Sequence, residues 1–276
     1  MILCADDYGL RDDINRAILE LCHARRLTAV SCMTVLERCD VSSAKELLLC
    51  QRSIDIGLHL CLTDEGLPLS ILAKSRDAVP STPFPSFKVL LAKALTGRLP
   101  LEKMKTLISA QYGLFLEKFG RAPDFIDGHL HTHQLPGVRH GLIEFVLSLP
   151  ETSRPYIRNT RMPLATLRHQ KLPWLKAAFI GAFGKRMAME LAAEGLRTNS
   201  DFAGIYSFGS KEAYATSFPR FMRCLPERNG ILVVHPGLDE AWRRAEFDVL
   251  KEYPFEKSAL NRFELRSAQS HAPDKL

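Results

Sequence analysis

The chain has 276 residues, of which 46% are hydrophobic and 25% charged, so it is long enough to bury a large core in one big domain or two small ones. No apolar run approaches the roughly 18 residues that a membrane span needs, and the start lacks the regions of a signal peptide, so we expect a cytoplasmic protein without stable membrane insertion. The formal net charge is +6, but Lys and Arg are scattered without a dense basic tract, so nucleic acid is not expected as a partner.

Short β runs alternate with amphipathic helical stretches along the chain, and this alternation is typical of an α/β protein. Seven runs is close to the number in a closed barrel. The predicted strands are Ile2–Ala5, Thr28–Val35, Asp55–Leu62, Asp124–Asp127, Tyr156–Asn159, Gly204–Phe208 and Gly230–Val234.

Two helices have clear boundary signals. The first follows the opening strand, where apolar residues recur at helical spacing and Asp12 and Asp13 are placed to cap the helix and complement its dipole. The second is predicted over Leu101–Phe119, stopped by Gly120. Residues 76–88 contain three prolines and no periodicity, which predicts a surface loop, and we assign 76–100 as a loop and helix insertion near the active site.

The first motif, Ala5-Asp6-Asp7-Tyr8-Gly9, places two carboxylates side by side at the end of the opening strand. Adjacent side chains point to opposite faces of a regular strand, but a turn here can direct both toward one site. Their repulsion would then require a cation between them. The alternative is an N-cap for the first helix, for which Asp12 and Asp13 are better placed.

His59 is a lone histidine in the otherwise apolar strand Ile56-Gly57-Leu58-His59-Leu60. It is either a metal ligand or a hydrogen-bonded core histidine, because an unpaired imidazole is costly to bury. The segment after the fourth strand, Asp127-Gly128-His129-Leu130-His131-Thr132-His133, is more specific. If the strand persists, one aspartate and three histidines line the same face, a pattern typical of metal or substrate binding.

A fourth motif, Val233-Val234-His235-Pro236-Gly237, ends a buried strand in a histidine followed by a sharp turn. His235 is either a general acid or a structural turn histidine. The known zinc signatures H-E-x-x-H and H-x-H-x-D-H are not found in the sequence. The carboxylates and histidines of these motifs fall at the carboxyl ends of separate predicted strands, where (β/α) barrels build their active sites.

Together, ADDYG, GLHL, DGHLHTHQLP and HPG resemble the motifs of the YdjC-like carbohydrate deacetylases, which include chitooligosaccharide and hopanoid-biosynthesis deacetylases. The resemblance runs from the first residue to about Gly237. It implies a TIM-like (β/α) barrel, in one domain over residues 1–276, and one divalent metal, zinc or magnesium. Carried over to this sequence, the ligands are Asp7, His59 and His129.

Similarity to sugar deacetylases also implies that Asp6 is the general base and His235 the general acid. Arg158 either orients the base through a bidentate contact or forms a plain surface ion pair. His131 and His133 are expected either to shape the substrate pocket or to hydrogen-bond the groups that hold the metal, and one of them could replace His129 as a ligand. A resemblance in the segment DFAGIYSF further places Asp201 and Phe202 at the substrate groove.

These assignments predict an enzyme that removes acetyl groups from N-acetylated sugars. Its acceptor could be a chito-oligosaccharide, a glycolipid or another amide, and a homodimer is plausible. One alternative is a metal-dependent phosphoesterase or other amidohydrolase that uses the same ligands. A third, a non-catalytic metal- or lipid-associated barrel, is disfavoured by the presence of both Asp6 and His235.

Overall fold

The computed structural model describes the chain except residues 64–83, 163–173, 207–210, 227, 256–259 and 264–276. Its strands are β1 (Ile2–Tyr8), β2 (Ala29–Cys32), β3 (Asp55–Leu60), β4 (Phe125–Gly128), β5 (Tyr156–Ile157), β6 (Asp201–Ala203) and β7 (Gly230–Val234). Its helices are α1 (Asp12–His23), α2 (Val41–Leu48), α3 (Phe87–Leu95), α4 (Leu101–Phe119), α5 (Val138–Ser148), α7 (Trp174–Ala193), α8 (Lys211–Cys224) and α9 (Ala241–Glu252), with short 3-10 helices η2 (His129–Gln134) and η3 (Glu151–Ser153).

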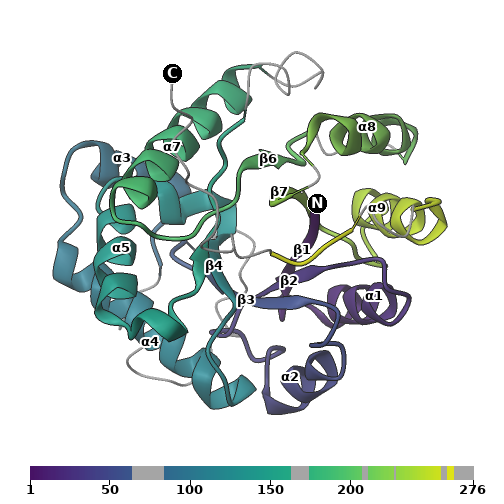
Figure 1. Ribbon diagram of the computed structural model, residues 1–276, viewed down its shortest axis with the longest axis horizontal. Helices are drawn as coiled ribbons and strands as arrows, with labels where there is room; N and C mark the ends of the chain where they lie inside the picture. Colours follow the sequence, from purple (N-terminus) through teal and green to yellow (C-terminus); the bar gives the residue numbers. More distant parts are fainter. Residues whose placement is uncertain (64–83, 163–173, 207–210, 227, 256–259, 264–276) are drawn as a thin grey trace, which may run out of the picture.

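The seven strands form one parallel sheet in the order β5-β4-β3-β2-β1-β7-β6, and the helices lie around its outside (Figure 1). The sheet curls until its two edges approach. There the Ile157 N–H donates to the Arg197 carbonyl at 2.9 Å, and Ile157 bridges to Thr198 just before β6 begins. This curled sheet is consistent with the predicted TIM-like barrel in an α/β protein.

Alternation along β1 shows how the sequence divides between the two faces of the sheet. Ile2 and Cys4 contact apolar side chains from other strands, which fill the barrel interior, whereas Leu3 and Ala5 pack in the large core beneath the helices. Both faces are therefore covered, as parallel sheets require, and β1 is buried along its whole length. The same alternation directs the side chain of Asp6 to the interior face.

The prediction of the sixth strand was wrong. The chain pairs with β7 over Asp201–Ala203, upstream of the predicted Gly204–Phe208, of which residues 207 and 208 lie outside the described part. Gly204 has a φ of +110°, and a Cβ there would lie 2.3 Å from the Val233 carbonyl oxygen. The strand therefore ends at Gly204, where the backbone turns tightly across β7.

The helix boundaries agree better with the sequence. Helix α4 spans the predicted Leu101–Phe119 and ends at Gly120, whose φ of +66° is left-handed. The capping prediction for α1 was wrong, because Arg11 is the N-cap residue and makes no side-chain cap. Asp12 and Asp13 do lie in the first turn. The Asp13 carboxylate instead accepts from the backbone N–H groups of Leu238 and Asp239 in the loop after β7.

The first part of the predicted insertion 76–100, residues 76–83, lies outside the described part of the chain. What the structure does describe of it includes α3, which starts at Phe87 and therefore covers the end of the predicted loop 76–88. No helix among the described residues is long and apolar enough to cross a membrane.

Candidate active site

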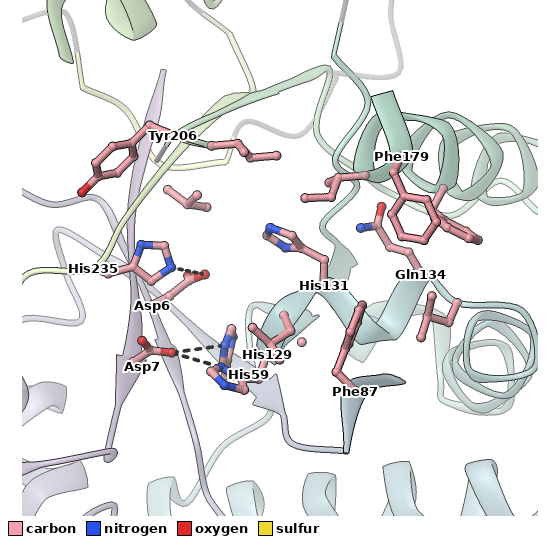
Figure 2. A pocket seen from close by; sticks show the side chains of 18 of the residues that line it. Asp6, Asp7, His59, Phe87, His129, His131, Gln134, Phe179, Tyr206 and His235 are labelled. Carbon is pink, nitrogen blue, oxygen red and sulfur yellow. Dashed lines mark ion pairs between the residues drawn. The ribbon is translucent and has the colours of Figure 1, made fainter. Parts of the chain in front are cut away.

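A bulge in β1 brings the two adjacent carboxylates to one site. Ala5 pairs with Val30 and Tyr8 pairs with Cys32, so two residues of β1 stand opposite one residue of β2. The backbone of Asp7 has a φ of +71°, a left-handed conformation that non-glycine residues rarely adopt. The bulge lets Asp7 point into the same cavity as Asp6 (Figure 2).

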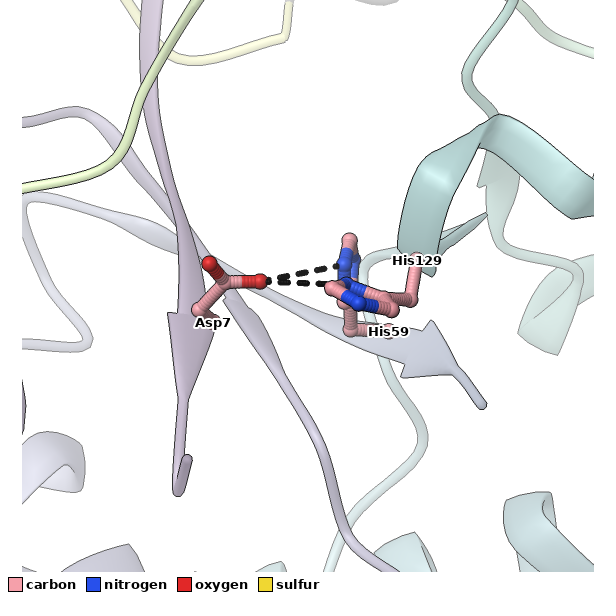
Figure 3. Close-up of side chains that lie close together, drawn as sticks. All are labelled: Asp7, His59 and His129. Atoms are coloured by element: carbon pink, nitrogen blue, oxygen red, sulfur yellow. Dashed lines mark ion pairs between the residues drawn. The ribbon is translucent and has the colours of Figure 1, made fainter. Parts of the chain in front are cut away.

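Asp7 converges with two imidazoles from neighbouring strands (Figure 3). Its Oδ1 lies 3.6 Å from Nε2 of His59 in β3 and 3.4 Å from Nδ1 of His129 directly after β4. The three candidate ligand atoms lie within 4.8 Å of one another, and Asp7 and His59 are buried. One carboxylate and two imidazoles in this arrangement fit a divalent metal and leave coordination positions for water and substrate. The sequence-predicted ligands are thus brought together.

His59 is oriented by a buried carboxylate on the adjacent strand. Its Nδ1 lies 2.7 Å from Oδ1 of Asp127, which also accepts from the Ser31 hydroxyl at 2.5 Å. Burial acts to lower the pKa of His59, but the carboxylates of Asp127, Asp6 and Asp7 together raise it, Asp127 through both its charge and its hydrogen bond. With Nδ1 engaged by Asp127, Nε2 is the nitrogen that faces Asp7, and a second carboxylate of this kind typically orients metal-binding histidines.

Arg158, directly after β5, joins the two buried carboxylates behind the site. It donates to both oxygens of Asp6 at 2.8 Å, and its Nη2 lies 2.7 Å from Asp127. Arg158 is fully buried, which excludes the surface ion pair and leaves the bidentate contact with the base candidate. Burial acts to raise the pKa of Asp6, but Arg158, through its charge and its hydrogen bonds, together with His59 and His235 holds this pKa well below its usual range.

A second group of possible ligands, Cys4, Asp6 and Asp127, lies next to this arginine. Burial raises the pKa of the Cys4 thiol well above its usual value, so the thiol stays protonated. The Arg158 guanidinium contacts both carboxylates and repels a cation. This group is therefore a salt-bridge cluster and not a metal site.

His235, the residue after β7, lies beside the base candidate, because β7 pairs with β1 up to Ala5 and Val234. Its Nε2 lies 4.0 Å from Oδ2 of Asp6 (Figure 2). Burial lowers the pKa of His235 to about 4, although Asp7 and Asp6 oppose this shift. The His235 backbone N–H donates to the carboxylate of Glu246 in α9. Helix α9 thus holds the backbone of His235 in place through Glu246.

The strand does not persist through His133, so the condition under which Asp127 and the three histidines would share one face is not met. The strand ends at Gly128, and the chain turns through η2, in which Leu130 and His131 have left-handed φ values of +53° and +58°. The turn keeps His129 and His131 at the cavity. It places His133 behind the cavity, where its Nε2–H donates to the Arg158 carbonyl at 2.8 Å.

The other two predicted substrate-binding residues lie in β6 and do not line the described cavity. Asp201 begins the strand and lies 3.6 Å from Arg161. Phe202 is buried and packs edge-on against His131, with ring centroids 5.4 Å apart. Phe202 therefore reaches the cavity only through the imidazole that it supports.

The cavity itself has a volume of about 540 Å³. The described lining residues are Asp6, Asp7, His59, Phe87, Gly128, His129, Leu130, His131, Gln134, Leu135, Phe179, Ile180, Phe183, Gly204, Ile205, Tyr206, Val233, His235, Trp242 and Arg243.

Sequence reasoning missed the contribution of α9. Arg243 donates to Oδ2 of Asp7 at 2.7 Å and to the His235 carbonyl at 3.3 Å, and its guanidinium stacks 4.4 Å from the Trp242 ring centroid. Glu246 accepts from the Tyr206 hydroxyl as well as from His235. In the sequence, the only signal for the contact between Arg243 and Asp7 is the pair Trp242-Arg243, soon after the His-Pro-Gly motif. By sequence alone this pair resembles the exposed start of an ordinary helix.

Comparison with known proteins identifies relatives over most of the chain. The family model described as YdjC-like protein matches residues 1–259. A chitooligosaccharide deacetylase of Yersinia enterocolitica is 33% identical over 186 residues, which cover 66% of this chain and 69% of the relative. A solved structure from Enterococcus faecalis, provisionally named a cellobiose-phosphate cleavage protein, superposes with a TM-score of 0.62 at 19% identity and covers 95% of each chain, which shows a shared fold.

Proposed function

The chain belongs to the YdjC-like protein family, and from this premise we propose that it is a metal-dependent hydrolase that removes acetyl groups from N-acetylated sugars. The observation that carries the proposal is the pairing, in one cavity, of the Asp7, His59 and His129 cluster with Asp6 and His235. Amide hydrolysis needs an activated water, a group that accepts its proton and a group that protonates the departing amine.

Asp7, His59 and His129 would hold one divalent ion, zinc or magnesium. When bound, such an ion polarises an acetyl carbonyl and acidifies water. Asp127 keeps the metal-facing nitrogen of His59 in place. Arg243 holds the second oxygen of Asp7, so a single oxygen of this carboxylate remains directed at the imidazoles.

Asp6 is proposed to accept the proton of the attacking water, because its carboxylate is ionised and fixed by Arg158. His235 is proposed to donate a proton from Nε2 to the departing sugar amine. With a pKa of about 4, His235 is neutral before reaction. The pKa of Asp6 is held well below its usual range, whereas the pKa of His235 is about 4. His235 therefore holds the proton taken from water more tightly than Asp6 does. The 4.0 Å separation is short enough for one intervening water.

His131 is proposed to contact the sugar. Its ring lies in the middle of the cavity, and its buried Nδ1 has no hydrogen-bond partner among the described residues (Figure 2). His133 and Phe202 are proposed to act indirectly, His133 through the Arg158 carbonyl and Phe202 through the ring of His131. Asp201 is proposed to lie at the edge of the substrate groove. The homodimer and the cytoplasmic location stay predictions.

Acetate release from N-acetylglucosamine and its oligomers by the metal-loaded protein tests the proposal. Release of acetate that is lost in Asp6→Asn supports it. Hydrolysis of p-nitrophenyl phosphate without acetate release would instead support a phosphoesterase. Metal binding without either activity would support a non-catalytic barrel.

A further inference from the structure

Trp242, in the first turn of α9, lines the cavity beside the proposed acid. The centroid of its ring lies 6.2 Å from that of the His235 imidazole, and the two ring planes are tilted by 57°. The guanidinium of Arg243 lies over the indole at 4.4 Å from its centroid, and the same guanidinium donates to Asp7 at 2.7 Å. The indole is therefore held in a fixed position relative to both the proposed acid and the proposed metal ligand.

The other described aromatic rings of the lining, apart from the imidazoles, are less suited to contact a substrate at this end. The phenylalanines come from α3 and α7, and Phe87 and Phe179 lie on the far side of the cavity from His235 (Figure 2). Tyr206 is only 7% exposed, and its hydroxyl already donates to a carboxylate of α9. Trp242 is half-buried and retains surface that the cavity can offer to a ligand.

The departing amine of an acetamido sugar fixes where its pyranose ring must lie. For His235 to protonate this amine, the nitrogen must come within about 3 Å of the imidazole Nε2, and the ring carbon is one bond further. The pyranose is thereby brought within stacking distance of the indole, since stacked rings lie about 4.5–7 Å apart between centroids. A pyranose presents a face of C–H groups, whose burial on an aromatic ring is favourable, while its hydroxyl groups remain at the edge in water.

Resting on the proposed function, we propose that Trp242 is a specificity-determining residue that stacks on the pyranose ring carrying the acetamido group. Arg243 limits the motion of the indole, so little conformational freedom is lost when the sugar binds. The indole thereby selects acetamido groups that are attached to a closed six-membered ring. An acetylated open-chain amine can reach the same acid, but it has no flat face to place on the indole.

The test compares acetate release from methyl N-acetyl-β-glucosaminide, whose ring is locked, with that from N-acetylglucosaminitol, the open-chain alditol that keeps the acetamido group. Trp242→Leu should lower kcat/KM for the glycoside about tenfold, chiefly through KM, because the stacking contact forms in the bound ground state as well as in the transition state. The value for the alditol should change less than about twofold, and Trp242→Phe should recover part of the loss on the glycoside. Equal losses on the two substrates would overturn the inference and leave the deacetylase proposal intact.

Two controls separate a contact with the sugar from an effect on Arg243. The metal-induced rise in Tm should be the same in Trp242→Leu as in the unmodified protein, because the bond from Arg243 to Asp7 does not pass through the indole. A smaller rise would show that Trp242 acts by positioning Arg243, and would reject the stacking role. Phe255→Leu removes an aromatic ring that also has an arginine over it, at 5.6 Å, but that is not part of the described cavity lining. This variant should change kcat/KM for neither substrate.

Binding gives a readout that does not depend on deacetylation. In saturation-transfer NMR with the metal-free protein, the ring C–H protons of methyl N-acetyl-β-glucosaminide should receive saturation. This transfer should be lost in Trp242→Leu and kept in Phe255→Leu. If no substrate releases acetate, the proposed function fails, whereas transfer that depends on Trp242 would still support the stacking contact. Transfer to the ring protons that is equal in Trp242→Leu and the unmodified protein would reject this contact, whatever the activity.

Discussion

The guanidinium of Arg243 lies 2.7 Å from Oδ2 of Asp7, while Oδ1 of the same carboxylate faces His59 and His129. The two residues are 236 positions apart in the chain. Burial acts to raise the pKa of Asp7, but Arg243, His129 and His235 together hold this pKa well below its usual range. Arg243 therefore neutralises the carboxylate in the metal-free protein and fixes which oxygen is presented to a metal.

Replacement of this arginine should have opposite effects on metal binding and turnover. In Arg243→Met, removal of a cation beside a divalent ion should enlarge the metal-induced rise in Tm by several degrees. The kcat should fall about tenfold or more, because the freed carboxylate can turn. Arg244→Met, whose exposed side chain pairs with Asp248, is the matched control and should change neither quantity. A smaller metal-induced rise in Arg243→Met would contradict this assignment.

The adjacent carboxylates should differ in what their amide variants lose. Asp7→Asn should weaken metal binding together with activity, because a ligand contributes in the resting enzyme. Asp6→Asn should retain the metal and lose on the order of a hundred-fold in kcat, the scale for a lost general base. Metal titration and steady-state kinetics on both variants separate the roles, and the reverse pattern would exchange them.

Asp127 should support the site without touching substrate. Asp127→Asn removes one of the two carboxylates that neutralise buried Arg158 and the charge that orients His59. We expect a loss of about 3 kcal/mol in the free energy of unfolding and a tenfold to hundredfold loss in metal affinity. Asp248→Asn, in an exposed ion pair, should cost under 1 kcal/mol. Chemical unfolding and metal titration are the measurements, and unchanged metal affinity would remove Asp127 from this role.

Metal content should depend on pH through His59. The purified protein should hold about one divalent ion per chain, and His59→Ala and His129→Ala should lose it. Because Asp127 raises the pKa of His59, protons should begin to compete with the metal above pH 6.5 as the pH falls. Elemental analysis after dialysis across pH 5 to 8 is the measurement. Full occupancy in both alanine variants would refute the ligand set.

Glu246 should make stability fall as pH rises. Burial raises its pKa to about 7 from a usual 4.5, so the folded state binds the proton more tightly than the unfolded state. Its contribution is therefore complete below pH 4.5 and is lost as pH rises through 7, by about 3 kcal/mol at most. Glu246→Gln should flatten this dependence. Parallel pH profiles of the free energy of unfolding in the two proteins would contradict it.

The sequence predicted those parts of the site that lie on strand ends. Asp6, Asp7 and His59 could be placed because a buried apolar run followed by polar residues indicates the carboxyl end of a parallel strand. The turn after Gly128 could not be foreseen, because Leu130 and His131 both adopt left-handed conformations, which non-glycine residues rarely adopt in succession. The family resemblance supplied the ligand roles that spacing alone left open.

The contributions of α9 could not be predicted for a different reason. Arg243 and Glu246 have the spacing of an ordinary amphipathic helix, and their partners are fixed only when α9 packs beside β7 and β1. The strand at Asp201–Ala203 was missed because Gly204–Phe208 has more strand-forming residues, and the close approach of Gly204 to Val233 is a tertiary effect.

Because of the bulge in β1, the site depends on the number of residues in this strand as well as on their side chains. Asp6 and Asp7 stand together opposite Ser31 because β1 has one residue more than β2 between their flanking pairs. A single-residue deletion there would restore a regular ladder and leave one carboxylate whose face is set by alternation alone. Such a deletion would remove the proposed separation of ligand and base roles between the two carboxylates, even if the fold survived and an aspartate remained. Engineered transfer of this site to another barrel must therefore copy the insertion as well as the side chains.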